Sequence, residues 1–148
     1  MKSLASSLAV LVLASTMVLA GGGDGWLVDY KEALEQAADK NQPILMEFTG
    51  SSWCPPCKMM KSEVFAAQDF KNFAAENLVL LELDFLPDGE PAVKKVAKQN
   101  TELAEKFQIE GFPTLILLDS KGNELARHVG FLPGGPKALI SWVQSETK

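Results

Sequence analysis

The sequence predicts an α/β domain, with a mixed central sheet that is covered by helices on both faces. Two observations carry this prediction. Helical and strand signals alternate between residues 29 and 146, an order that is typical of a sheet flanked by helices. The strand signals are short apolar runs, which indicate strands buried on both faces. A length of 148 residues suits one compact domain of this kind.

In the first half of the domain, helix boundaries are marked by residues that favour helix ends. Asp29 can cap a helix that ends at the run Asn41-Gln42-Pro43. Pro55 and Pro56 mark the start of another helix, because proline is tolerated in the first turn, where N–H groups lack partners. The expected elements are a helix at 30–38, a strand at 44–49 and a helix at 55–77 that breaks near 65–68.

In the second half, two apolar runs are joined by a helical segment and followed by a hairpin. The four residues from Ser120 to Asn123 favour a tight turn between two antiparallel strands. The expected elements are a strand at 78–85, a turn at 86–91, a helix at 93–107 with a break near Asn100 and Thr101, strands at 114–118 and 124–129, and a last helix at 134–146.

Composition and charge exclude several classes of protein. Apolar residues make up 47% of the chain and charged residues 22%, so most of the chain has enough apolar material for a core and is not disordered. The net charge is −5 and no block of Lys or Arg is present, which argues against nucleic-acid binding. The single histidine, His128, leaves little for histidine-based metal or acid–base chemistry, and we expect it to be structural or on the surface.

Residues 1–20 have the pattern of a secretory signal peptide. Lys2 is the only charged residue before Asp24, an apolar stretch follows it, and Ala20 precedes three glycines. The alternative is an uncleaved membrane anchor, but a span needs about 20 predominantly apolar residues, and this stretch is shorter and interrupted by hydroxyl side chains. We expect residues 21–148 to be the folded domain, in the periplasm or otherwise exported, where disulfides persist.

Cys54 and Cys57 are the only cysteines, and they lie between a buried strand and a helix. A disulfide between them would stabilise the fold only weakly. Closing a four-residue loop contributes only about 1.9 kcal/mol of stability, against about 3 kcal/mol for a 15-residue loop. As a closed zinc site, two cysteines and the distant His128 are one ligand short of four. Both alternatives remain open, but neither explains the position of the pair.

Redox chemistry explains the position of the pair better. The start of a helix offers unpaired N–H groups and the positive end of the helix dipole, which stabilise a thiolate at Cys54. Cysteines in such places can have pKa values of roughly 3.5–7.5. The second thiol, Cys57, can reach back across one turn and displace a substrate sulfur from Cys54. We therefore expect Cys54 to be the exposed attacking thiol and Cys57 the buried resolving thiol.

Two motifs carry a family resemblance. The run W-C-P-P-C-K begins at Trp53 after a strand, and G-F-P-T precedes a later strand. Over residues 24–148 the chain resembles the thioredoxin superfamily, and within it the exported reductases of the DsbH type and the carboxy-terminal domain of the DsbD type. The resemblance implies a thioredoxin fold, thiol:disulfide oxidoreductase activity without a cofactor or metal, and a cis Pro113. It also implies that the backbone of Phe112 pairs with an extended substrate.

Glu47 is the only charged residue in its apolar strand and lies seven residues before Cys54. Thioredoxins carry an acidic residue at the matching strand position, usually six residues before the cysteine, so the loop here is one residue longer. The resemblance implies a buried carboxylate with a raised pKa that accepts the proton of Cys57. The alternative is a solvent-facing glutamate on an edge strand.

The dipeptide between the cysteines indicates the direction of electron flow. Pro55 and Pro56 have no N–H groups and no charge, so they stabilise the Cys54 thiolate less than a histidine would. A less stabilised reduced form means a lower potential, which favours a reductase. Next to Cys54, Trp53 is expected to offer apolar contact to a peptide, and Lys58 to support the thiolate electrostatically.

The sequence leaves two other functions open. One is a disulfide oxidase or isomerase, and the other is a copper-binding module on the same fold. Copper carriers generally need a longer cysteine spacing and a nearby histidine ligand, whereas His128 is the only candidate here. The expected partners are cysteine-containing protein substrates and a membrane thiol that donates electrons, and the chain is expected to be a monomer.

Overall fold

The computed structural model describes residues 25–148. The strands are β1 (Trp26–Leu27), β2 (Ile44–Thr49), β3 (Val79–Asp84), β4 (Thr114–Leu118) and β5 (Glu124–Val129). The helices are α1 (Tyr30–Lys40), α2 (Pro55–Met59), the π-helix η1 (Met60–Phe65), α3 (Gln68–Asn77), the 3-10 helix η2 (Lys94–Val96), α4 (Ala97–Lys106) and α5 (Gly135–Glu146). The predicted signal peptide, residues 1–20, lies outside the described residues.

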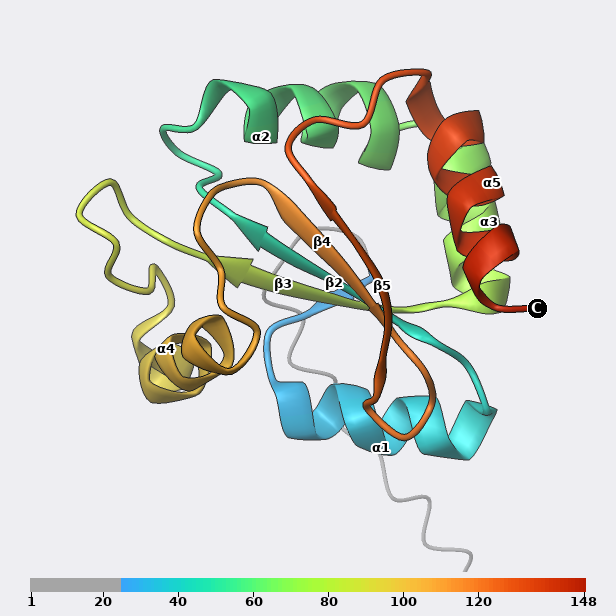
Figure 1. Cartoon of the computed structure of the whole chain (residues 1–148), viewed down its shortest axis with the longest axis horizontal. Helices are drawn as coiled ribbons and strands as arrows, with labels where there is room; N and C mark the ends of the chain where they lie inside the picture. The colour runs from blue at the N-terminus through green and yellow to red at the C-terminus, as the bar shows by residue number, and fades with distance from the viewer. Residues whose placement is uncertain (1–24) are drawn as a thin grey trace, which may run out of the picture.

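The strands form one mixed sheet in the order β1-β3-β2-β4-β5, with helices on both faces (Figure 1). β2 is central: it runs parallel to β3, with Glu47 opposite Glu82, and antiparallel to β4, with Glu47 opposite Leu115. All six residues of β2 are buried. The predicted fold class is therefore confirmed, and the apolar run at 44–49 is a strand covered on both sides.

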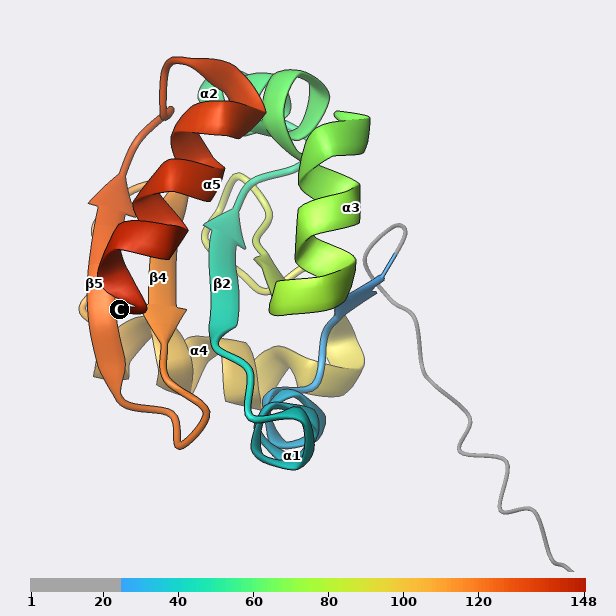
Figure 2. The same cartoon turned by 90° about the vertical axis from the view of Figure 1, so that its right-hand side faces the viewer.

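Each face of the sheet has its own core. Along β2, Leu45 packs with Met60 and Val64 of η1, with α3 and with α5, whereas Met46 and Phe48 pack with α1 and α4. Figure 2 looks onto the first of these faces, where α5 and α3 lie to the left and right of β2, with α1 at the lower end of the strand. Because side chains alternate along a strand, Glu47 lies on the same face as Leu45, beneath η1 and α3.

Helix boundaries follow the predicted caps at several positions. The Asp29 side chain accepts a hydrogen bond of 3.0 Å from the N–H of Glu32, which caps α1. α2 begins at Pro55, and the expected break before Asn77 is present where η1 ends at Phe65 and α3 begins at Gln68. Among residues 25–148, no helix combines the length and the apolar character needed to cross a membrane.

Two features of the chain differ from the prediction. The predicted break at Asn100 and Thr101 is wrong, because both residues lie inside α4 and the change of helix type occurs at Val96 and Ala97. Asn100 is buried and its side-chain oxygen accepts a hydrogen bond from the adjacent Gln99, so its packing in the fold outweighs its weak helix propensity. β1 was not predicted, since two residues show no periodicity. It is defined by its pairing with β3.

Candidate active site

The cysteine pair lies where β2 passes into α2. Cys54 occupies the position before the first helical residue, in an extended backbone conformation, and Cys57 lies inside the first turn. The two form a disulfide, with their Cα atoms 5.3 Å apart. Pro55 and Pro56 fill the helix positions between them, so neither position presents an N–H group at the helix start.

Both cysteines are almost completely covered in this disulfide state. Cys54 is 3% exposed and Cys57 is 1% exposed. The expectation that Cys54 is exposed is therefore wrong for the oxidised protein, because neighbouring groups cover its sulfur. One of them is the carbonyl oxygen of Phe112, which lies 3.6 Å from Cys54 Sγ.

Gly50 organises the loop in front of the pair. Its carbonyl accepts hydrogen bonds from the N–H groups of Trp53 and Cys54, at 3.1 and 2.9 Å, and its own N–H points at Cys57 Sγ, 3.4 Å away. A Cβ atom at this position would lie 2.6 Å from the indole ring of Trp53. The close approach of the Trp53 ring therefore requires glycine at position 50. The sequence did not predict this role, because the contact forms only in the folded loop.

The end of β3 holds the same loop from the other side. Asp84 accepts hydrogen bonds from the N–H and the hydroxyl of Ser51, and the carbonyl of Phe85 accepts one of 2.9 Å from the indole Nε1 of Trp53. Hydrogen bonds from Ser51 and Trp53 therefore hold the loop between β2 and α2 to the end of β3. Sequence reasoning missed Ser51 and the carbonyl of Phe85, since the partners lie more than 30 residues apart.

Aromatic rings form a wall beside the disulfide. The rings of Trp53 and Phe112 meet edge to face, with centroids 6.0 Å apart, and Phe85 stacks on Phe112 at 5.3 Å. The peptide bond between Phe112 and Pro113 is cis, as the family resemblance implied. The structure thus brings Trp53, Phe112 and Pro113 to the cysteine pair, although they come from two distant segments.

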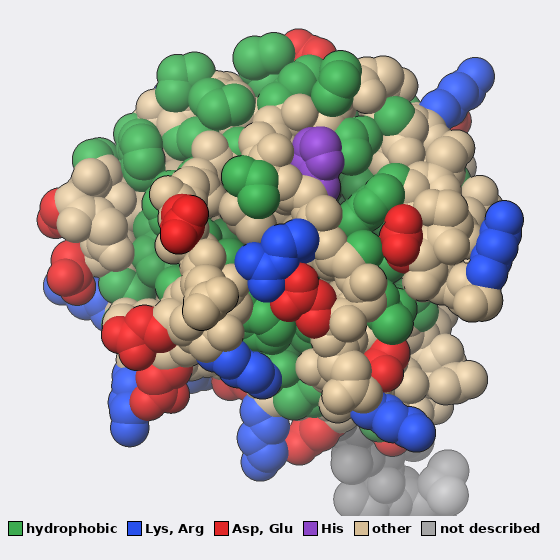
Figure 3. All heavy atoms as spheres, viewed as in Figure 1, with side chains coloured by type: hydrophobic (Ala, Val, Ile, Leu, Met, Phe, Trp, Pro, Cys, Tyr) green, Lys and Arg blue, Asp and Glu red, His purple; other side chains and the backbone are tan. Residues whose placement is uncertain are grey.

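The surface around the pair is largely apolar. Trp53, Met59 and Leu86 are among the exposed large hydrophobic side chains, at 37%, 42% and 39%. Trp53 precedes α2, Met59 ends it, and Leu86 follows Phe85, whose carbonyl accepts the hydrogen bond from the Trp53 indole. Apolar side chains gather along the edge of the molecule over α2, with few charged groups between them (Figure 3). Lys58 is exposed on α2, one residue beyond Cys57.

Glu47 is buried in the central strand, with 3% of its surface exposed. Its Oε1 atom has no hydrogen-bond partner among the described residues. Burial, the largest cause, and the nearby charge of Glu82 raise the pKa of Glu47 to about 8, although a hydrogen bond from Thr49 and the charge of Lys61 act in the opposite direction. The alternative of a solvent-facing glutamate on an edge strand is wrong.

The single histidine, His128, is paired with Leu115 of β4. His128 is in β5, where its Nε2 atom is 3.4 Å from the carbonyl oxygen of Phe131. Within residues 25–148, no three His, Cys, Asp or Glu side chains are grouped closely enough to hold a metal ion.

Known proteins share this sequence pattern. Residues 30–144 match the thioredoxin-like domain family. The disulfide bond reductase DsbH of Chlamydia pneumoniae is 37% identical over 136 residues, which cover 92% of this chain and 80% of that protein. The thioredoxin-related protein DsbJ of the same organism is 33% identical over 69% of this chain, but the match covers only 29% of DsbJ.

Solved structures share the fold. A DsbH oxidoreductase superposes with a TM-score of 0.75 at 33% identity, covering 95% of this chain and 94% of that one. The carboxy-terminal domain of DsbD from Neisseria meningitidis, in its reduced form, gives a TM-score of 0.60 at 17% identity over 78% of this chain and 92% of that domain, a likeness of fold alone.

Proposed function

The chain belongs to the thioredoxin-like family, and on that basis we propose that it is an exported reductase of protein disulfides. Its activity is thiol:disulfide exchange. The observation that carries this proposal is the disulfide between Cys54 and Cys57 at the start of α2, beside the cis Pro113. DsbH, with which the chain shares 37% identity, is named a disulfide bond reductase, which supports the reducing direction.

The reaction proceeds in two exchanges. The Cys54 thiolate attacks one sulfur of the substrate disulfide, a mixed disulfide forms, and the other substrate sulfur leaves as a thiolate. Cys57 then loses its proton and attacks Cys54 Sγ, which breaks the mixed disulfide and releases the second substrate sulfur. Two electrons pass to the substrate, and the protein is left with the Cys54–Cys57 disulfide seen in the structure.

Glu47 is the proposed acceptor for the proton of Cys57. A free cysteine thiol has a pKa of about 8.5, and burial raises the pKa of Glu47 to about 8. Because the two proton affinities are close, proton transfer between them costs little free energy near neutral pH. The face of β2 that carries Glu47 is the face covered by η1, which continues α2 beyond Cys57.

The aromatic wall supports a binding role for Trp53, Phe112 and Pro113. A substrate segment that lies along the cis Pro113 can pair with the backbone of Phe112, while Trp53 and the exposed Met59 and Leu86 offer apolar contact. Pro55 and Pro56 withhold two N–H groups from Cys54, which supports a low potential and thus the reducing direction. Lys58 is proposed to favour the thiolate by its charge.

Catalytic turnover requires a supply of electrons. After one reaction the pair is oxidised and has to be reduced by another thiol, and we assign that role to a membrane thiol carrier. Residues 1–20 are the proposed signal peptide, which places the domain in the periplasm or otherwise outside the cytoplasm. We propose that the protein acts as a monomer.

Reduction of insulin by dithiothreitol, followed by turbidity, tests the proposal. The domain 21–148 should accelerate insulin reduction, and Cys54→Ser should abolish the acceleration. Equilibration with glutathione tests the direction: a reductase should have a potential near that of thioredoxin, about −270 mV, rather than near that of DsbA, about −120 mV. An inactive wild type would overturn the activity, and a potential near that of DsbA would favour an oxidase.

A further inference from the structure

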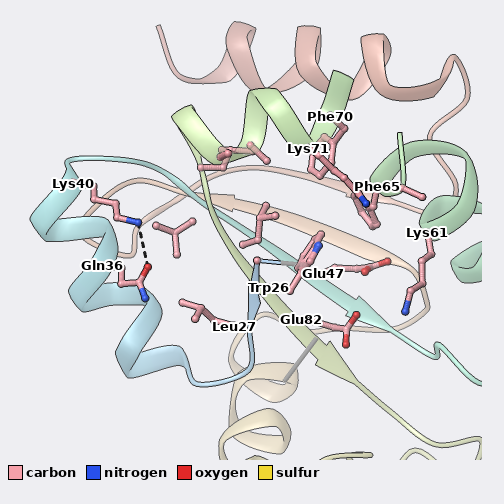
Figure 4. A pocket seen from close by; sticks show the side chains of 17 residues that line it. Trp26, Leu27, Gln36, Lys40, Glu47, Lys61, Phe65, Phe70, Lys71 and Glu82 are labelled. Carbon is pink, nitrogen blue, oxygen red and sulfur yellow. Dashed lines mark hydrogen bonds between the residues drawn. The ribbon is translucent and has the colours of Figure 1, made fainter. Parts of the chain in front are cut away.

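A cavity of about 540 Å³ opens at the β1 edge of the sheet, between the strands and the helices η1 and α3. Its walls are largely apolar, with Trp26, Phe65 and Phe70 among them. Glu47, Glu82 and Lys61 line the end that lies toward β2 (Figure 4). These charged side chains come from three different elements, and they point toward one another in the close-up view.

Sheet pairing brings the two acids together. Glu47 and Glu82 are opposite each other in the parallel pair β2 and β3, so both side chains project to the same face. Lys61 reaches the same space from η1, above the sheet. Its ammonium group makes no ion pair within the described part of the chain, but its charge lowers the pKa of both acids.

The Oε1 atom of Glu47 has no hydrogen-bond partner among the described residues. That atom is buried, and its side chain lines the cavity. A buried carboxyl oxygen without a hydrogen-bond partner is costly unless the group is neutral or has a function. We propose that Glu82 and Lys61 are positioning residues for the resolving step: Glu82 holds the proton of Cys57 on Glu47, and Lys61 favours its release.

This inference rests on the proposed role of Glu47 in the reductase. In the resolving step, the sulfur of Cys57 forms a bond to Cys54 Sγ, the bond to the substrate sulfur breaks, and the proton of Cys57 moves to a carboxylate oxygen of Glu47. The negative charge of Glu82 strengthens the hold of Glu47 on that proton. The positive charge of Lys61 weakens it and returns Glu47 to the carboxylate form for the next cycle.

Other polar and charged groups also lie near Glu47 or line the cavity. Asp84, also on β3, raises the proton affinity of Glu47 less than Glu82 does, and its oxygens are engaged by Ser51. Thr49, two residues along β2, donates a hydrogen bond to Glu47 and acts in the opposite sense. Lys40 of α1 and Lys71 of α3 line the cavity as well. β4 contributes the apolar Leu115 opposite Glu47.

Carboxyl carbon NMR of Glu47 in the oxidised domain 21–148 measures its pKa directly, without any activity. We expect Glu82→Gln to lower that pKa and Lys61→Met to raise it, each on the order of one unit. Glu82→Asp keeps the charge and should stay close to wild type. The exposed Glu63→Gln, on η1, and Lys137→Met, on α5, are matched controls that should leave the pKa unchanged.

A second experiment measures the rate of the resolving step at several pH values, by rapid quench of the mixed disulfide. The pH midpoint of this rate should move down in Glu82→Gln and up in Lys61→Met, whereas the rate of the first attack by Cys54 should not change. In a Glu47→Gln background neither change should move the profile. Shifts in the same direction, or shifts that persist in that background, would overturn the inference. If the wild-type domain does not accelerate insulin reduction, the proposed function is refuted. The pKa measurements would still test the effect of Glu82 and Lys61 on Glu47.

Discussion

Asp84 accepts both hydrogen bonds that Ser51 can donate. The N–H of Ser51 lies 2.8 Å from Asp84 Oδ1, and its hydroxyl lies 2.5 Å from Oδ2. Asp84 is the last residue of β3, and Ser51 belongs to the loop that leads to Cys54. This bidentate contact therefore fixes the loop of the cysteine pair to the sheet, over a separation of 33 residues along the chain.

Asp84→Ala should loosen the loop and slow the first attack. Hydrogen bonds to a charged group contribute about 1.5–3 kcal/mol each, and solvent at this half-buried site replaces part of that, so we expect a loss of about 1–3 kcal/mol in the free energy of unfolding. Urea unfolding and the rate of mixed-disulfide formation measure the two effects. Asp88→Ala, in the exposed turn after β3, is the control, and equal behaviour of the two variants would contradict the anchoring role.

Gly50→Ala should displace the indole of Trp53. The new Cβ would lie 2.6 Å from the ring, whose Nε1 donates to the carbonyl of Phe85, so this hydrogen bond should be lost and insulin reduction should fall. A changed Trp53 chemical shift or fluorescence reports the displacement. Gly111→Ala is a matched control, because a Cβ there meets no atom within 4 Å. An unchanged Trp53 signal in Gly50→Ala would refute the packing argument.

Cys54 should react first when the reduced protein meets a limiting amount of an alkylating reagent. It lies before the first helical residue, whereas Cys57 lies inside the helix with the N–H of Gly50 directed at its sulfur. Mass spectrometry of the singly labelled protein identifies the site. Preferential labelling of Cys57 would exchange the proposed roles of the two thiols.

Oxidation of the pair should change stability only modestly. The disulfide closes a loop with a sequence separation of 3, for which the loss of chain entropy in the unfolded state corresponds to about 1.9 kcal/mol. Urea unfolding of the oxidised and reduced proteins measures the difference. Amide NMR should show shifts confined to the site, and widespread shifts far from it would contradict this expectation.

Glu47→Gln should change both stability and the resolving step. The folded pKa of about 8 lies above the unfolded value near 4.5, so the protonated group contributes fully below about pH 4.5. Its contribution is lost as the pH rises toward 8, because the unfolded chain ionises while the folded one keeps its proton. The variant should therefore show a flatter pH dependence of stability in this window, and should be at least as stable as wild type at pH 8.

Kinetically, the same variant lacks the proton acceptor. General-base catalysis is typically worth about 10²–10⁴-fold, and water can replace part of it, so the resolving step should slow while the attack by Cys54 keeps its rate. Quenched-flow analysis of the mixed disulfide separates the two steps. If both rates match wild type, Glu47 has only a structural role.

The sequence was sufficient for those features that depend on neighbouring residues. The strand at 44–49, the Asp29 cap and the helix start at Pro55 follow from patterns a few residues long, and the structure has all three. The motif from Trp53 to Lys58 identified the reactive pair, and the resemblance of the run around Pro113 implied its cis peptide bond. Helix caps and buried strands are predictable because their physical causes are local.

Tertiary structure alone decided which distant residues meet. Whether Glu47 is buried or solvent-facing depends on strand order, which made β2 central and placed Glu82 opposite it. The contacts of Asp84 with Ser51, and of Gly50 with the ring of Trp53, likewise form only after β3 pairs with β2 and the loop closes. The sequence therefore determined the reactive cysteines, whereas the fold determined the charges and anchors around them, because electrostatic and packing interactions depend on distance in space rather than along the chain.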